Sequence, residues 1–303
     1  MQQHVLISGA SGLIGSALST HLARLGFVVH ALERDNPAAR FNYSSASRQV
    51  ALDHSISLSA VINLAGPSIA DGRWTARRKQ ELLESRVDLT TALATALAAA
   101  PQPPALFLSA SAVGFYGEST LPLNEEAPAG DDYLASLATR WEAATAPARQ
   151  VGIPTAHLRF GVVLSTKGGV LGKLMLPFSL CVGGKLGDGH QPMSWIALPD
   201  VLNLLTRLIE APAVLTAHTD SEGVSALNLV ADEPITNAVF TKALGRALHR
   251  PTPFPLPKPL IRLLFGEMGD ALLLGHSAVI STRLAALGYT LKYPNIDLAL
   301  DYL

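Results

Sequence analysis

Three glycines, Gly9, Gly12 and Gly15, have a type and a spacing that could bind a phosphate group. An apolar run precedes them and a helical pattern of leucines follows, so they occupy a strand-to-helix turn. At such a turn, backbone N–H groups and the positive helix end attract a pyrophosphate, and glycines let it approach. The spacing G-x-x-G-x-x-G differs from the plainest dinucleotide fingerprint, but the context favours a dinucleotide site over a structural turn. The candidate contacts are Gly9, Ser11, Gly12, Leu13, Ile14 and Gly15.

Two neighbouring charges, Glu33 and Arg34, could select the form of the dinucleotide. They end the next apolar run, about 20 residues after the glycines, where the adenosine ribose is expected. Glu33 could accept hydrogen bonds from the ribose hydroxyls of NAD, and its charge would repel a 2′-phosphate. Arg34 could instead hold that phosphate through a bidentate guanidinium contact, which is the stronger interaction. We therefore expect NADP, with NAD as the alternative, and expect one of the two charges to be a solvated surface residue.

An arginine lies on the apolar face of a predicted helix. One stripe of this helix holds Leu82, Arg86, Leu89, Leu93 and Leu97. Their three- and four-residue spacing places them on the same side of a helix. Burying a charge without a partner is very unfavourable, so Arg86 should meet either a protein carboxylate or a ligand phosphate. The sequence leaves both partners open.

Apolar runs alternate with helical patterns over the first half of the chain. We expect strands at 4–8, 27–32, 60–64, 105–108 and 155–160, with a serine-rich turn after 108. Such alternation predicts an α/β fold with a doubly wound parallel sheet. Glycine becomes frequent after 160, which predicts a smaller and less regular C-terminal region. We expect a dinucleotide-binding domain over 1–160 and a mainly substrate-binding region over 161–303, with some elements returning to the sheet and the ligand between the two.

The composition excludes several classes of protein. With 303 residues, 49% of them hydrophobic and 16% charged, the chain is expected to be globular with a sizeable core. Its 23 basic and 24 acidic residues give a net charge of −1, which predicts neither a nucleic-acid nor an anionic-membrane partner. The single cysteine and scattered histidines give no metal motif, and no apolar run reaches a membrane span. We expect a cytoplasmic protein with a small-molecule substrate, and the oligomeric state stays open.

Several further blocks of sequence occur in a familiar order. They are 63–66, 72–74, 79–81, 85–87, 109–117, 158–164, 183–184, 187–191, 194–196 and 265–268. Together with the glycine turn they resemble the extended short-chain dehydrogenase/reductase superfamily, and within it the atypical YfcH-like NAD(P)-dependent epimerase family. The resemblance covers essentially the whole chain and implies a Rossmann domain, a C-terminal substrate region and a bound nicotinamide dinucleotide. The further cofactor-facing residues that it implies are Leu64, Ala65, Gly66, Glu81, Arg86 and Val162.

The catalytic residues of that superfamily are only partly present. Its hydride step uses a Ser or Thr, a Tyr, and a Lys four residues after the Tyr, whose ammonium lets the tyrosine act as a base near neutral pH. Ser111 fits the serine. Tyr133 lies in the expected tyrosine region, but residue 137 is leucine, and no tyrosine in this sequence has a lysine four residues later. Ser111, Tyr116 and Tyr133 are the candidate catalytic residues. A substrate-lining or packing role is favoured over proton transfer for Tyr116, and a surface or packing role is favoured for Tyr133.

The leading functional hypothesis is an NADP-dependent oxidoreductase or epimerase that acts on a small hydroxyl or carbonyl substrate. Ser111 would orient the substrate oxygen while a hydride moves between substrate carbon and nicotinamide. The missing lysine motivates a rival, a non-catalytic NADP-binding module that responds to redox state. Glu33 is the local support for a third hypothesis, a strict sugar-nucleotide epimerase that retains NAD.

Overall fold

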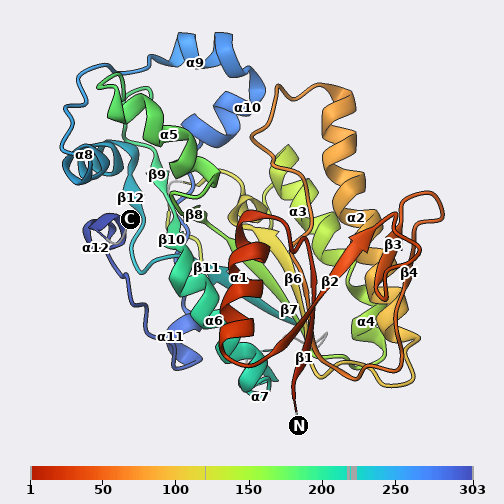
Figure 1. Ribbon diagram of the computed structural model, residues 1–303. Coiled ribbons are helices and arrows are strands. Elements are labelled where there is room, and N and C mark those ends of the chain that lie inside the picture. Colours follow the sequence, from red (N-terminus) through yellow and green to blue (C-terminus); the bar gives the residue numbers. More distant parts are fainter. Residues whose placement is uncertain (1, 120, 217–218, 220–223, 302–303) are drawn as a thin grey trace.

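The computed structural model describes residues 2–119, 121–216, 219 and 224–301. Its main strands are β1 His4–Ser8, β2 Val28–Arg34, β3 Asn42–Ser44, β4 Gln49–Ala51, β5 Leu58–Asn63, β6 Phe107–Ala112, β7 Thr155–Phe160 and β11 Val224–Leu229. They form one eight-stranded sheet in the order β11-β7-β6-β5-β1-β2-β3-β4 (Figure 1). Neighbouring strands are parallel, apart from the antiparallel pair β3 and β4.

Helices cover both faces of this sheet. They are α1 Leu13–Arg24, α2 Ala76–Ala98, α3 Tyr133–Ala143, α4 Ala146–Gln150, α6 Leu198–Glu210 and α7 Ala213–Thr216. Side chains alternate between the two faces of a strand, so Val5 and Ile7 of β1 join one core cluster and Leu6 joins another. The first cluster includes residues of α1 and α6, which pack side by side, and the second includes residues of α2 (Figure 1). The predicted doubly wound α/β fold is therefore confirmed.

The remaining elements are smaller, and most of them gather over the carboxyl edge of the sheet, whereas the helix Arg283–Ala286 packs against β11 (Figure 1). They are the 3-10 turn η1 Val113–Tyr116, β8 Val162–Leu164, α5 Gly169–Ser179, β9 Pro192–Met193, β10 Trp195–Ala197, β12 Ile235–Thr236, α8 Asn237–Ala247, α9 Lys258–Phe265, α10 Glu267–Gly269, the π-helical turn η2 Asp270–Leu274, α11 Arg283–Ala286 and α12 Ile296–Asp301. Two short strand pairs, β8 with β10 and β9 with β12, connect them. In Figure 1, α5, α8, α9 and α10 lie together at the upper left. Among the described residues, no helix is both long enough and apolar enough to cross a membrane.

One strand boundary differs from the sequence prediction and affects the site. Strand β2 ends in its two charges, as the sequence predicts, and Glu33 and Arg34 pair with Asn42 and Tyr43 of β3. The serine-rich segment after 108 is not a turn but the second half of β6, which pairs with β7 as far as Phe160. Tertiary pairing has overridden the turn preference of serine. The sheet therefore holds Ser111 itself.

Candidate functional site

The glycine turn connects β1 to α1 in a conformation that larger residues cannot adopt. Gly9 has a φ of +77°, and a Cβ atom on it would lie 2.8 Å from the carbonyl oxygen of Leu64. A Cβ on Gly15 would lie only 2.1 Å from the carbonyl oxygen of Gly9. Gly12 occupies the position before α1 and has no side chain to accept from the first N–H groups of the helix. The turn can therefore present those N–H groups to an anion.

A cavity of about 590 Å³ lies against this turn. Parallel strands end at the same edge of a sheet, and the residues that end or follow β1, β5, β6 and β7 all line the cavity. The wall opposite the strand ends comes from α5, α8, α10 and η2, and the start of α5 also lies against Leu13 of the glycine turn. The sequence-predicted residues that the structure brings together here are Gly9, Gly12, Leu13, Ile14, Gly15, Leu64, Ala65, Gly66, Arg86, Ser111 and Val162.

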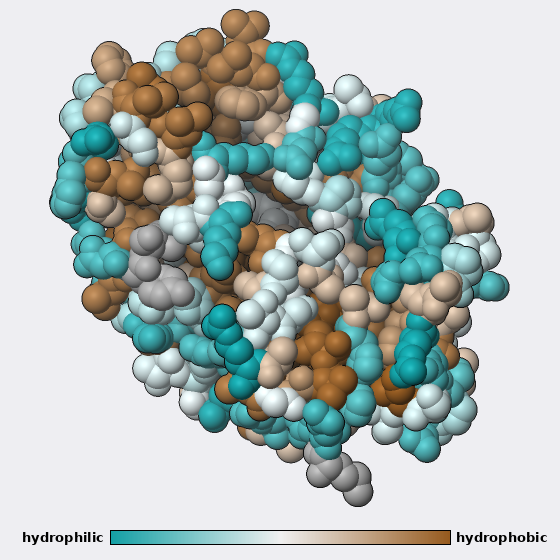
Figure 2. Space-filling view, in the orientation of Figure 1, coloured by the Kyte–Doolittle hydropathy of each residue, from teal (hydrophilic) through white to brown (hydrophobic). Residues whose placement is uncertain are grey.

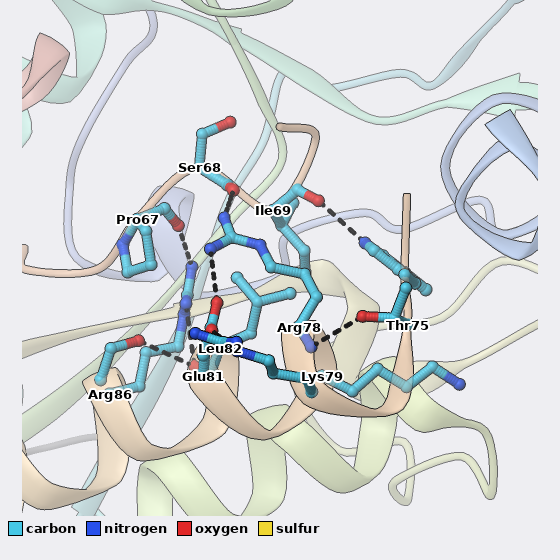
Figure 3. A network of polar contacts seen from close by, with 12 residues as sticks. Pro67, Ser68, Ile69, Thr75, Arg78, Lys79, Glu81, Leu82 and Arg86 are labelled. Carbon is cyan, nitrogen blue, oxygen red and sulfur yellow. Dashed lines mark hydrogen bonds and ion pairs between the residues drawn. The ribbon is translucent and has the colours of Figure 1, made fainter. Parts of the chain in front are cut away.

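Arg86 projects from α2 into the wall of the cavity and has no carboxylate partner among the described residues. Its side chain is buried, and its Nη2 and Nη1 atoms donate to the carbonyl oxygens of Pro67 at 2.8 Å and Leu82 at 3.0 Å (Figure 3). The guanidinium carbon lies 5.1 Å from the ring centre of Trp141. Burial lowers the pKa of Arg86 to about 10, so the group stays charged at neutral pH. A buried cation without a described counter-charge fits a ligand anion better than a structural salt bridge.

The other charges on this part of α2 do not line the cavity. Glu81 forms ion pairs with Arg77 at 2.9 Å and Arg78 at 3.5 Å on the exposed side of the helix. Arg78 also donates to the carbonyl oxygen of Ser68, one residue beyond the carbonyl that Arg86 binds (Figure 3). Ligand contact by Glu81 therefore stays a prediction that the cavity does not support.

Glu33, Arg34 and Ser11 lie outside the cavity, at the same edge of the sheet. The register pairs Ser8 of β1 with Leu32 of β2, so the two charges follow at the level of the glycine turn. Both are exposed, and Glu33 accepts a hydrogen bond from Asn36 at 2.7 Å. Arg34 forms no ion pair with a described residue, so its guanidinium is available to a ligand phosphate. Ser11 lines a separate groove beside α1.

Ser111 joins the cavity to a buried ionic cluster. Its Oγ donates to Oε1 of Glu142 at 2.6 Å, and Glu142 accepts two further hydrogen bonds from Arg159, at 2.8 and 2.9 Å. Burial raises the pKa of Glu142, but hydrogen bonds from Arg159 and His157 outweigh that effect and hold the pKa at about 2. The carboxylate is therefore ionised and can only accept. Since a serine hydroxyl has one proton, Ser111 is left as a hydrogen-bond acceptor towards the cavity.

Tyr116 does not line the cavity. Its hydroxyl donates to Oδ1 of Asn228 at 2.7 Å and accepts from Nη1 of Arg159 at 2.8 Å. Burial raises the pKa of Tyr116, although Arg159 opposes the effect. Catalysis by Tyr116 stays a prediction, and this geometry favours a structural role.

Tyr133, at the start of α3, is also outside the cavity wall. Its hydroxyl donates to the carbonyl oxygen of Lys79 at 3.1 Å, and its ring packs edge-on against Trp74. Burial raises the pKa of Tyr133, which is the opposite of what a base near neutral pH requires. Leu137, at the position where the superfamily has its lysine, lines the cavity instead. Proton transfer by Tyr133 thus stays a prediction that its contacts do not favour.

Sequence reasoning missed two residues of α3 that act at this site. Trp141 stacks near Arg86, and Glu142 determines the hydrogen bonding of Ser111. Both lie on the buried face of α3. A carboxylate on an apolar helix face was the available signal, since the same argument singled out Arg86. No group of three or more metal-binding side chains occurs among the described residues.

The doubly wound sheet, the glycine turn and the buried arginine around one cavity define a Rossmann-type α/β protein. The family model described as "NAD dependent epimerase/dehydratase family" matches residues 5–219, and a domain of unknown function, DUF1731, matches 256–303. Epimerase family protein Mb2239 from Mycobacterium bovis is 39% identical over 301 residues, which cover 98% of this chain and 96% of that protein. Human epimerase family protein SDR39U1 is 37% identical over 302 residues, 98% of each chain.

Two solved structures are similar over the whole chain. Human SDR39U1 (isoform 2), crystallised with NADPH, has a TM-score of 0.86 and 34% identity, and the match covers 99% of this chain and 98% of that one. A nucleoside-diphosphate sugar epimerase from Corynebacterium glutamicum has a TM-score of 0.75 and 32% identity, covering 100% of this chain and 59% of that one. The chain therefore belongs to the NAD dependent epimerase/dehydratase family, and the resemblance to extended short-chain dehydrogenases/reductases is confirmed.

Proposed function

We propose that this protein is an NADP-dependent oxidoreductase or epimerase that converts a small hydroxyl or carbonyl substrate in the cavity. The observation that carries the proposal is Arg86, a buried cation with no described carboxylate partner, in the same cavity as the glycine turn. The family and the NADPH in the human relative's structure support a dinucleotide at this place. The residues that would hold it are Gly9, Ser11, Gly12, Leu13, Ile14, Gly15, Arg34, Leu64, Ala65, Gly66, Arg86 and Val162.

The nicotinamide would supply hydride exchange with a substrate carbon. The chain's own groups bind the dinucleotide and orient the substrate. The first N–H groups of α1 and the Arg86 guanidinium balance negative charge, and the cavity walls exclude water. The hydroxyl of Ser111 donates its proton to Glu142, so its oxygen accepts a hydrogen bond from a substrate hydroxyl. Ser111 thereby orients the alcohol form of the substrate.

We further propose that 1–160 supply most of the dinucleotide contacts and that 161–303 supply most of the substrate contacts. The glycine turn, Arg86 and Ser111 all lie before 160, whereas the opposite wall comes from α5, α8, α10 and η2. The return of β11 to the sheet, beside β7, ties the two parts together.

Calorimetric titration with NADPH and with NADH tests the cofactor assignment without a known substrate. We expect NADPH to bind more tightly, and Arg34→Ala to weaken NADPH binding by about tenfold to a hundredfold while NADH binding stays unchanged. The matched control is Arg24→Ala, in the last turn of α1, which should change neither affinity. Failure of both nucleotides to bind the natural protein would refute the proposed function.

A non-catalytic NADP-binding module is the second candidate. It is favoured by the tyrosine hydroxyls of Tyr116 and Tyr133, which are engaged within the protein, and by Leu137 in place of a lysine. This candidate predicts tight NADPH binding without NADPH oxidation over a broad set of aldehydes and ketones. A steady oxidation rate that Ser111→Ala abolishes would exclude it.

A further inference from the structure

The chemistry of the wall opposite the strand ends identifies a class of substrate. We propose that the cavity takes a predominantly apolar molecule with a single oxygen function, a hydrophobic ketone or secondary alcohol, and not a nucleoside-diphosphate sugar. The inference rests on the proposed function, because it assigns the dinucleotide to the glycine-turn side of the cavity and the substrate to the other side.

Aliphatic, sulfur-containing and aromatic side chains form most of the substrate side. Helix α5 contributes Val170 and Leu174, and α8 contributes Phe240. The segment that contains α10 and η2 adds Met268, Leu272 and Leu273. Transfer of hydrocarbon from water to such a surface is favourable, whereas a sugar hydroxyl that loses water there gains no hydrogen bond from these side chains.

Charge in the cavity is confined to the cofactor side. Of the described residues that line it, Arg86 alone carries a charge, and its guanidinium lies beside Gly66 in the strand-end wall. Lys173 of α5 does not line the cavity and pairs with Asp71 at 2.6 Å on the exposed surface. Since the dinucleotide already brings a diphosphate, a sugar nucleotide would add a second diphosphate for which the lining offers no separate cation.

Two amide side chains on the substrate side are partly engaged in hydrogen bonds within the protein. Gln191 donates through Nε2 to the carbonyl oxygens of Leu186 at 3.1 Å and Leu273 at 2.8 Å, and Oδ1 of Asn237 accepts from the backbone N–H of Leu186 at 2.8 Å. These bonds use both donors of the Gln191 amide, so it cannot donate to the several hydroxyls of a sugar. Its buried Oε1 has no hydrogen-bond partner among the described residues and can accept from a single substrate hydroxyl.

The apolar surface continues to the outside of the protein. Val170 lines the cavity and is also 39% exposed, so this wall reaches solvent. Beyond it, Leu176 of α5 is 68% exposed and Leu263 of α9 is 69% exposed. Figure 2 shows hydrophobic residues gathered at the upper left, over α5 and α9. A hydrocarbon substrate would therefore meet apolar side chains from the entrance inwards.

Calorimetric titration of the protein saturated with NADPH tests the substrate class without turnover, because neither an alcohol nor a sugar nucleotide is oxidised by the reduced cofactor. The probes are 2-butanol, 2-hexanol, 2-octanol and UDP-glucose, since an alcohol can donate to Ser111 and a ketone cannot. We expect affinity to rise by about fourfold for each added methylene, about 250-fold from 2-butanol to 2-octanol. We expect UDP-glucose to bind more weakly than 2-octanol. Affinity that does not depend on chain length, or tighter binding of UDP-glucose than of 2-octanol, would overturn the inference.

A pair of variants on α5 locates the effect. Leu174→Gln, on the cavity wall, should weaken 2-octanol binding by about tenfold and leave NADPH binding unchanged. Leu180→Gln, at the exposed end of the same helix and outside the cavity lining, should change neither. Equal losses in both variants would contradict the inference. A natural protein that binds no NADPH refutes the proposed function itself, whereas one that binds NADPH without discriminating among the alcohols refutes only the substrate class.

Discussion

Replacement of Arg86 by methionine tests whether the protein keeps a buried charge for its ligand. Burial lowers the pKa of Arg86 from 12.5 to about 10, which corresponds to about 3 kcal/mol against the charged form. Neutral pH lies below both the ordinary and the lowered pKa, so Arg86 is charged in the folded and in the unfolded chain. The ligand-free protein is therefore destabilised by the full free energy of burying this charge. The variant also loses two hydrogen bonds from a charged donor, to Pro67 and Leu82, at about 1.5 kcal/mol or more each. These two effects offset each other, so we expect the free energy of unfolding of ligand-free Arg86→Met to match that of the natural protein to within about 1 kcal/mol.

The same variant should bind NADPH about tenfold to a hundredfold more weakly, since a hydrogen bond from a charged donor contributes about 1.5–3 kcal/mol. Urea unfolding without ligand and calorimetry with NADPH measure the two effects separately. Arg78→Met is the matched control on the same helix, because Arg78 pairs with Glu81 and does not line the cavity. Its NADPH affinity should be unchanged. A ligand-free Arg86→Met protein that loses more than about 2 kcal/mol, with NADPH binding intact, would refute the reasoning.

Two further variants test the buried cluster and the turn. In the natural protein the pKa of Glu142 is about 2 instead of 4.5, so its stabilisation, about 3 kcal/mol, is present above pH 4.5 and is lost as the pH falls towards 2. The free energy of unfolding of Glu142→Gln should be about 3–5 kcal/mol lower at neutral pH, because the charge of Arg159 stays buried without its partner. In urea unfolding, the stability of this variant should depend less on acid pH than that of the natural protein. An unchanged acid dependence would contradict this. Gly15→Ala should destabilise the fold and abolish NADPH binding, since its Cβ would lie 2.1 Å from a backbone oxygen. The control Gly172→Ala, whose Cβ would have its nearest contact at 3.5 Å, should keep the melting temperature and the NADPH affinity of the natural protein. Normal NADPH binding by Gly15→Ala would show that the turn can shift.

The sheet could be predicted where local pattern and tertiary pairing agree. The run His4–Ser8 and the glycines after it were sufficient for β1 and the turn, because each backbone requirement there is local. The serines of β6 were predicted as a turn, because isolated serine favours local hydrogen bonds. Their pairing with β7 depends on residues almost fifty positions later in the chain, and no local pattern contains it.

The site shows the same division between local and distant information. Arg86 could be identified because a charge on an apolar stripe is visible within one helix. The cluster around Ser111 could not, since it needs the register that sets Ser111 beside Arg159 and the packing that brings Glu142 to both. The apolar wall escaped prediction for a related reason. Its residues come from α5, α8 and the segment around η2, which only the folded chain brings to one surface.

The position of β11 at the edge of the sheet has a consequence for synthesis of the chain on the ribosome. Strand β7 ends at Phe160, but the strand that covers its free edge begins at Val224. While 161–223 are being translated, the sheet lacks β11, and the backbone N–H and C=O groups on the free edge of β7 have no partner strand. Such an edge is a template for pairing with another chain. The period of greatest aggregation hazard is therefore set by the order of elements along the polypeptide, and a chain stopped at 160 would remain in that hazardous state.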